Sequence, residues 1–170
     1  EVADIDEMTE VLAALQVRKR PAGRRIAAVT GSGGQAELVL DIAEAHAVDL
    51  PPLSAASRAE AESVIGHLTG DGNPMDAWGN GDVARNLPHA FSVLDRDPNY
   101  DVIVLCNENI DNAPIGRSEA VMKLFCVSAQ ASSKPHFALN MRPGLMHSGN
   151  LELLREAGAG MLGGARQGLG

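Results

Sequence analysis

The chain has 170 residues, a length that suits one ordinary domain whose hydrophobic core needs no metal or disulfide. Its formal net charge of -8 disfavours binding to nucleic acids and anionic membranes, and its three Phe, one Tyr and one Trp offer no platform for base stacking. No apolar run approaches the roughly 20 residues that span a bilayer and no leader precedes the first helix, so we expect a cytoplasmic protein and, because the chain begins at Glu1, a piece of a larger one.

Residues 1–24 predict a helix and a basic linker, and residues 25–170 the main domain. From Val2 to Leu15 apolar residues recur every three or four positions, as on one face of a helix, and acidic residues on the other face indicate a solvated surface helix. The run "RKRPAGRR", residues 18–25, contains proline and glycine and therefore breaks that helix. A linker is the simpler interpretation of the run, and a basic patch for a polyanion such as coenzyme A is the alternative.

Strands and helices then alternate along the chain. The expected strands are "RIAAVT" (25–30), "DLPPLS" (49–54, a short proline-limited strand or extended stretch), "YDVIVLC" (100–106), "PHFALNM" (135–141) and "AGMLGG" (159–164). Helices are expected over 33–47, 55–68 with Ser54 as the cap, 83–97, 117–133, and 150–158 with Gly158 at the end. This alternation predicts an α/β, doubly wound, mainly parallel five-stranded sheet of the flavodoxin-like kind.

Several apolar side chains of these elements are expected to be structural. In the helix over 33–47 the residues expected to face inward are Leu38, Val39, Ile42 and Ala45. The two cysteines, Cys106 in a strand and Cys126 in a helix, have no CxxC motif or His/Cys cluster near them. We therefore expect burial rather than a redox or metal role for both thiols.

Ligands of such sheets bind beyond the carboxyl ends of the strands. Three segments are expected to meet there, namely "TGSGG" (30–34), "CNENIDNAP" (106–114) and "NMRPGLMHSG" (140–149). The glycine-rich loop that contains Asn73 and Asp76 is long and polar, and we expect it to fold over the same edge.

The first of these segments predicts an anion site. Glycines at 31, 33 and 34 are expected to let the backbone turn sharply and approach a ligand, while the helix N-terminus favours a phosphoryl group by about 1 kcal/mol. Tight packing of strand on helix is the alternative, because "GSGGQA" is neither a Walker loop nor a dinucleotide fingerprint. The candidate phosphate-binding residues are Ser32, Gly33, Gly34 and Gln35, and the further candidates are Gly31 and Asn73.

Asp76, in "NPMD", is the candidate catalytic residue. Its carboxylate is suited to orient an imidazole or to bind a metal through oxygen, and a turn-capping role is the alternative. His147 lies on a loop expected at the same edge, but neither a serine nucleophile motif nor a ligand partner is spaced around it. No metal site is expected.

The order of motifs resembles that of the NDP-forming (ADP-forming) acyl-CoA synthetases of the succinyl-CoA synthetase superfamily. The similar pieces are "RIAAVTGSGGQAELVLD", "DLPPLS", "NPMD", "DRDPNYDVIVL" and "LREAGAGMLGG", and "VADIDEMTEVLAAL" is similar to the helix that enters this domain. In that family a histidine on a mobile loop carries a phosphoryl group between an acyl-CoA site and an ATP-grasp nucleotide site. The resemblance implies the flavodoxin-like ligase-CoA domain that precedes the ATP-grasp, with the helix that opens at Ser32–Gly34 directed at the phosphohistidine.

By the same resemblance the whole enzyme is an acid-thiol ligase that interconverts acyl-CoA, ADP and phosphate with acid, CoA and ATP. CoA, ATP or ADP, and Mg are implied for the whole enzyme, and none for this piece by itself. The implied partners are a CoA-binding domain, a phosphohistidine domain and an ATP-grasp domain. Because the histidine loop and these partners are missing from the sequence, we expect no turnover by this chain alone.

Two other functions are compatible with this fold. A non-catalytic binding or assembly module is the first alternative, since the partner domains are missing. A flavodoxin-like flavin carrier is the second, although only Trp78 and Tyr100 are available to flank a flavin ring. Response-regulator chemistry is disfavoured because the first strand ends in Thr30 and Gly31 rather than in paired acids.

Overall fold

The computed structural model describes residues 2–108, 115–144 and 146–169. In chain order the elements are α1 (Ile5–Leu15), β1 (Ile26–Thr30), α2 (Gly33–His46), α3 (Ala55–Ile65), β2 (Met75–Asp76), α4 (Val83–Arg96), β3 (Val102–Asn107), α5 (Ile115–Ala131), β4 (His136–Asn140), α6 (Ser148–Ala157), β5 (Gly160–Gly163) and α7 (Ala165–Leu169). The expected caps of two helices are confirmed, since the Ser54 side chain accepts from the Ser57 amide and Gly158 ends α6 in the left-handed region.

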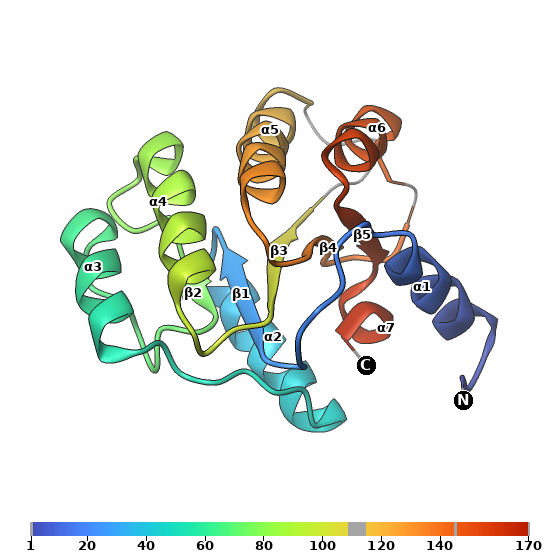
Figure 1. Ribbon diagram of the computed structural model, residues 1–170, viewed down its shortest axis with the longest axis horizontal. Coiled ribbons are helices and arrows are strands. Elements are labelled where there is room, and N and C mark those ends of the chain that lie inside the picture. Colours follow the sequence, from blue (N-terminus) through green and yellow to red (C-terminus); the bar gives the residue numbers. More distant parts are fainter. Residues whose placement is uncertain (1, 109–114, 145, 170) are drawn as a thin grey trace.

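The five strands form one parallel sheet in the order β2-β1-β3-β4-β5 (Figure 1). Val29 lies at the centre of the β1 pairings, with Met75 of β2 on one side and Leu105 of β3 on the other. The strand order confirms the predicted flavodoxin-like, doubly wound sheet. All strands are parallel, but β2 is added on one side of β1 and β3 to β5 on the other, so the topological switch point lies between β1 and β3. A ligand site is therefore expected where these two strands end.

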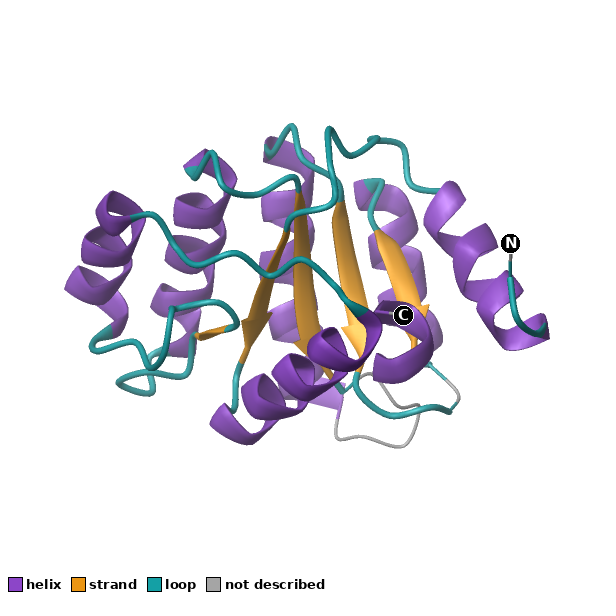
Figure 2. Cartoon of the chain, turned by 90° about the horizontal axis from the view of Figure 1, so that it is seen from below, coloured by secondary structure: helices purple, strands orange, loops and turns teal. Residues whose placement is uncertain are grey.

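Helices cover both faces of the sheet, so strand side chains are buried on both sides. Phe91, Phe125 and Leu154 from α4, α5 and α6 share one apolar core with Ala27 and Val29 of β1. On the other face Val39 of α2 and the apolar residues of α7 pack against β3 and β4. Figure 2 shows α2 and α7 in front of the strands and α4, α5 and α6 behind them. The continuous apolar strands of the sequence are explained by this double cover.

The second strand is not where the sequence placed it. Residues 49–54 form no strand, because their two consecutive prolines have no amide hydrogen to donate to β1. The strand that pairs with β1 is β2, which lies inside the glycine-rich loop. Beside β2 the side chain of Asn73 extends the pairing, since its Oδ1 accepts from the Ala28 amide at 2.9 Å and its Nδ2 donates to the Ile26 carbonyl at 2.8 Å.

The first helix is a surface helix, as predicted. Its large apolar residues and Val2 are exposed, from 39% for Met8 to 66% for Ile5, whereas Ala13 and Ala14 are half-buried. The helix turns Glu10 toward β5, and the carboxylate accepts from the Gly163 amide at 2.8 Å. In α2, Val39 is buried as expected, whereas Leu38 is 44% exposed because α7 covers only part of the helix. Ala45 of α2 is exposed too.

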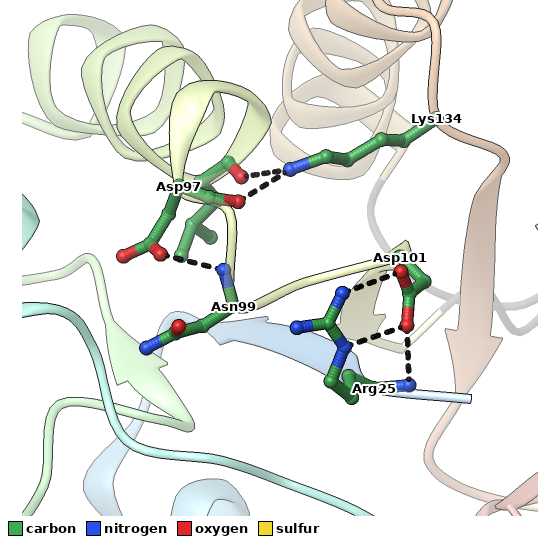
Figure 3. Close-up of polar contacts among 6 residues, drawn as sticks. Arg25, Asp97, Asn99, Asp101 and Lys134 are labelled. Carbon is green, nitrogen blue, oxygen red and sulfur yellow. Dashed lines mark hydrogen bonds and ion pairs between the residues drawn. The ribbon is translucent and has the colours of Figure 1, made fainter. Parts of the chain in front are cut away.

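Polar contacts fix the amino ends of β1 and β3 (Figure 3). The Arg25 guanidinium pairs with the Asp101 carboxylate, and the same carboxylate accepts from the Arg25 amide. The ion pair holds the pKa of Asp101 at about 2. The Lys134 ammonium donates to the Leu94 and Asp97 carbonyls at the end of α4, at 2.9 and 2.8 Å. These contacts hold the amino end of β1 next to that of β3, and the segment before β4 next to the end of α4.

The basic run also belongs to this amino edge. Lys19 donates to the carbonyls of Ala129 and Ser132 where α5 ends, and Arg25 is held by Asp101. The run therefore ties the chain to the end of the sheet opposite the expected ligand site. Among the described residues, no helix is both long and apolar enough to cross a bilayer.

Candidate functional site

The amino end of α2 is the first part of the candidate site. It follows β1 directly, where the Thr30 hydroxyl donates to the Ser32 carbonyl at 3.2 Å and the Gln35 amide donates to the same carbonyl at 3.1 Å. Ser32 is the N-cap residue, but its side chain makes no capping hydrogen bond. The first amides of a helix have no helical acceptor, and Ser32, Gly33 and Gly34 are exposed. The Ser32 hydroxyl and the amides of Gly33 and Gly34 thus lie at an exposed helix end that favours anions.

The glycines of this turn are not required by the chain itself. Gly31, Gly33 and Gly34 all have ordinary backbone conformations without a positive φ. A Cβ atom added at Gly31 would meet nothing within 4 Å, and those at Gly33 and Gly34 would make ordinary contacts at 3.7 and 3.9 Å. The expectation that glycine makes the sharp turn is therefore wrong for these positions. What the missing side chains leave is an open surface over the helix end.

Asp76 lies beside this helix end. It follows Met75 in β2, pairs with Thr30 of β1, and its Oδ2 is 3.7 Å from the position of a Cβ on Gly33. Its Oδ1 accepts from the Trp78 amide at 3.0 Å. The structure thus brings Asp76 together with Ser32 and Gly33, and the carboxylate also holds the turn that was its alternative role.

Asn73 has a structural position instead. Only 5% of it is exposed, and its Nδ2 donates to the Pro51 carbonyl at 2.9 Å in addition to its two bonds with β1. All of its hydrogen-bonding groups face backbone groups of the chain. It does not line the cavity described next.

A cavity of about 810 Å³ lies at the point where the strand order reverses. Gly31, Ser32 and Gln35 form one end of it, and Asn107 at the end of β3 lies on its floor. Apolar residues of α4 and its preceding loop form the opposite wall, among them Trp78 and Leu87. The cavity has the size of pockets that hold small organic ligands and lies where doubly wound sheets bind them.

The second expected segment contributes two polar residues to the cavity. The Asn107 Nδ2 atom is buried and has no hydrogen-bond partner among the described residues, while Glu108 forms an ion pair with Arg142 at 2.8 Å. Residues 109–114 of that segment lie outside the described residues. Cys106 also lines the cavity, but burial raises the pKa of its thiol to about 12, so it remains protonated and is no nucleophile at neutral pH. Cys126 is buried as predicted too.

The described residues of the third segment do not line the cavity, and Leu145 lies outside the described residues. Arg142 touches it only through Glu108, and His147 is the N-cap residue of α6 without a side-chain capping bond. The two aromatic residues that a flavin would need are also apart. Trp78 lines the cavity, whereas Tyr100 is 2% exposed at the amino end of β3 and its hydroxyl donates to the Pro51 carbonyl. Within the described ranges no group of three or more His, Cys, Asp or Glu side chains could hold a metal ion.

The α4 side of the site was not predicted from the sequence. Its contribution comes from Trp78, Val83, Ala84 and Leu87, which periodicity alone assigns to a loop and a helix. One signal was present: the only tryptophan of the chain stands in the glycine-rich loop rather than in a strand or helix. A large apolar side chain in a polar loop is an informative exception.

No protein-family model matches the chain, and no curated protein matches it. Among solved structures it is similar to PH0766 from Pyrococcus horikoshii OT3, at 21% identity and a TM-score of 0.69 over 99% of this chain and 38% of that one. It is also similar to the dinucleotide forming acetyl-coenzyme A synthetase 1 of Ca. Korarchaeum cryptofilum, at 15% identity and a TM-score of 0.67. That likeness covers 98% of this chain and 35% of the synthetase solved with phosphate and ADP, or 36% of its apo form. The chain therefore spans little more than a third of either protein, and what it shares with them is the fold.

Proposed function

We propose that this chain is the domain of an NDP-forming acyl-CoA synthetase that receives a phosphorylated histidine from another domain at the amino end of α2. The observation that carries the proposal is the open helix end, where three glycines leave a surface that the chain's own packing does not need. The likeness to part of an acetyl-coenzyme A synthetase and the resemblance of the sequence motifs support it.

The residues at the helix end have complementary roles in this proposal. The amides at the start of α2 and the Ser32 hydroxyl donate to the phosphoryl oxygens, which carry negative charge. Asp76 accepts the N–H of the imidazole that carries the phosphoryl group, and so holds the ring in position. A phosphorylated imidazole places its ring between the phosphoryl charge and the carboxylate, whereas free phosphate can donate only an O–H and brings its charge directly to Asp76, so the site favours phosphorylated imidazole over phosphate.

The chemistry belongs to the assembled enzyme. In the proposed direction the phosphorus–nitrogen bond of phosphohistidine breaks, the phosphoryl group passes to ADP to give ATP, and the imidazole is regenerated. CoA, the nucleotide and Mg bind to the CoA-binding and ATP-grasp domains, and this domain stabilises the charged intermediate by electrostatic preorganisation.

The test is a titration of the isotopically labelled chain, followed by amide NMR, with phosphoimidazole and separately with inorganic phosphate. Phosphoimidazole is expected to shift the amides of residues 32–35 and to bind more tightly than phosphate. In Asp76→Asn the preference for phosphoimidazole is expected to disappear. The matched Asp41→Asn variant, which removes an exposed carboxylate of α2 outside the cavity, serves as the control.

Absence of shifts at residues 32–35 with phosphoimidazole, in a chain whose spectrum shows it folded, overturns the proposal. A non-catalytic module of the same fold predicts that result.

A further inference from the structure

The cavity extends well past the helix end that receives a phosphoryl group. Its far wall is built from Val83, Ala84 and Leu87 of α4, with Leu105 of β3 and Val121 of α5. None of these side chains has a polar group to offer a ligand. A phosphoryl group at α2 therefore leaves most of the roughly 810 Å³ to an apolar part of a ligand.

Trp78 stands at the mouth of this apolar part and is held there by its backbone. Its amide donates to Asp76 at 3.0 Å, and its carbonyl accepts from the Asn86 side chain at 3.1 Å and from the Gly81 amide at 2.7 Å. The next residue, Gly79, has a φ of 46°, and a Cβ there would lie 2.3 Å from the Ile65 carbonyl oxygen, so the close approach of this loop to the end of α3 requires glycine. Trp78, whose backbone is held in this way, is 43% exposed and offers a planar apolar surface to a ligand.

The charges of the cavity distinguish between classes of organic acid. Of the described residues that line it, Asp82 and Glu108 are acidic and none is lysine or arginine. The nearby Arg142 is already paired with Glu108. On the side of the cavity formed by the ends of β1 and β3 the donors include the α2 amides and the Asn107 Nδ2, whereas the side chains of Val83, Ala84 and Leu87 on the α4 wall have no polar group. One carboxylate can be bound on the side of these donors, while a second would face apolar side chains or other carboxylates.

We propose that Trp78 and the apolar wall of Val83, Leu87 and Leu105 select the acid that the synthetase activates, and that this acid is an apolar monocarboxylic acid with an aryl or bulky alkyl group rather than a dicarboxylic acid. The inference rests on the proposed function, because it assumes that an acyl group reacts beside the helix end. Trp78 is a specificity-determining residue in this arrangement and takes no part in bond making.

The chain contains one tryptophan, so its fluorescence reports on the cavity directly. Titration with phenylacetate and with isovalerate is expected to change the Trp78 emission in a saturable way. Succinate and acetate are expected to bind at least about tenfold more weakly, since they lack the apolar contact or add a charge. Saturable binding of succinate as tight as that of phenylacetate, or no binding of phenylacetate, overturns the inference.

Two variants test the wall by calorimetry. Trp78→Ala is expected to weaken phenylacetate binding about tenfold, and Ala84→Glu to weaken it at least as much by adding a carboxylate to the cavity. Ala84 is exposed in the first turn of α4, where an acidic residue suits the helix, so Ala84→Glu keeps the fold. The matched control is Val127→Ser, a change of a 66% exposed apolar residue on α5 outside the cavity, which leaves binding unchanged.

The NMR titration with phosphoimidazole separates the two proposals. If phosphoimidazole shifts the amides of residues 32–35 but phenylacetate does not bind, only the specificity inference fails. If phenylacetate binds and phosphoimidazole does not, the proposed function fails and the cavity remains a site for an apolar acid.

Discussion

The Oδ2 atom of Asp76 lies 3.7 Å from the point where a Cβ atom on Gly33 would stand, so a carboxylate and the open end of α2 share one small region. The helix end attracts an anion, and the carboxylate opposes it. A ligand that satisfies both must present negative oxygen atoms to the amides and a hydrogen-bond donor to Asp76.

Removing the charge of Asp76 should therefore strengthen binding of a simple anion. In Asp76→Asn we expect inorganic phosphate to bind about fivefold more tightly at low salt. The reason is that two unit charges about 4 Å apart in water repel by about 1 kcal/mol, and a phosphate at the helix end would lie about that far from the Asp76 carboxylate. Amide NMR titration of wild type and variant measures the two dissociation constants. Equal affinities would show that phosphate does not bind beside Asp76.

The open space over Gly33 predicts that this glycine can be replaced by alanine without loss of stability. Gly33→Ala should keep or raise the free energy of unfolding by up to about 1 kcal/mol, because alanine favours the helix and the new Cβ clashes with nothing. Gly160→Ala is the matched comparison, since its Cβ would stand 2.7 Å from both Phe137 and Val17. That variant should lose about 1–3 kcal/mol. Urea unfolding of both checks the pair, and a large loss in Gly33→Ala would mean that the turn needs its glycine.

Asn73 predicts a large effect on stability. Asn73→Ala removes three hydrogen bonds and leaves the Ala28 amide and the Ile26 and Pro51 carbonyls without this partner. We expect a loss of about 2–4 kcal/mol in the free energy of unfolding, measured by urea denaturation. Asn99→Ala, whose side chain donates only to the Pro52 carbonyl near the surface, should cost less than about 1 kcal/mol. Similar losses in the two variants would contradict the bridging role of Asn73.

His136 predicts a loss of stability in acid. It is 1% exposed, and burial lowers the pKa of its imidazole from 6.5 to about 4, with Lys19 and Lys134 acting in the same direction and Asp95 against them. Below pH 6.5 the unfolded chain binds a proton that the folded chain does not, so stability present above pH 6.5 declines toward pH 4 by about 3 kcal/mol.

The measurement is the free energy of unfolding across this pH range. His136→Asn keeps an N–H donor for the Lys134 carbonyl that His136 contacts at 3.0 Å, and it should flatten that part of the pH profile. His67→Asn serves as the control, because that side chain is 83% exposed. A wild-type profile that is already flat would contradict the buried neutral imidazole.

Helices and strands could be predicted from the sequence wherever a local residue pattern is compatible with only one secondary structure. Apolar runs of strand length and amphipathic segments with caps at Ser54 and Gly158 gave the elements, and their alternation gave the parallel sheet. Prediction failed for the second strand, because a two-residue pairing beside Asn73 leaves no periodicity to detect. It failed also for Leu38 and Ala45 of α2, which were expected to face inward and are exposed, because periodicity reports that a face is apolar and not what covers it.

The same division holds for the candidate site. That a helix begins directly after β1 could be predicted from the sequence, because a short polar segment with serine separates an apolar strand from an amphipathic helix. The position of Asp76 beside Gly33, and that of Trp78 at an apolar cavity lined by α4 and α5, depends on the tertiary structure. Asp76 and Gly33, and likewise Trp78 and Val121 of α5, are more than 40 residues apart along the chain, and such contacts depend on strand order and helix packing rather than on local preference.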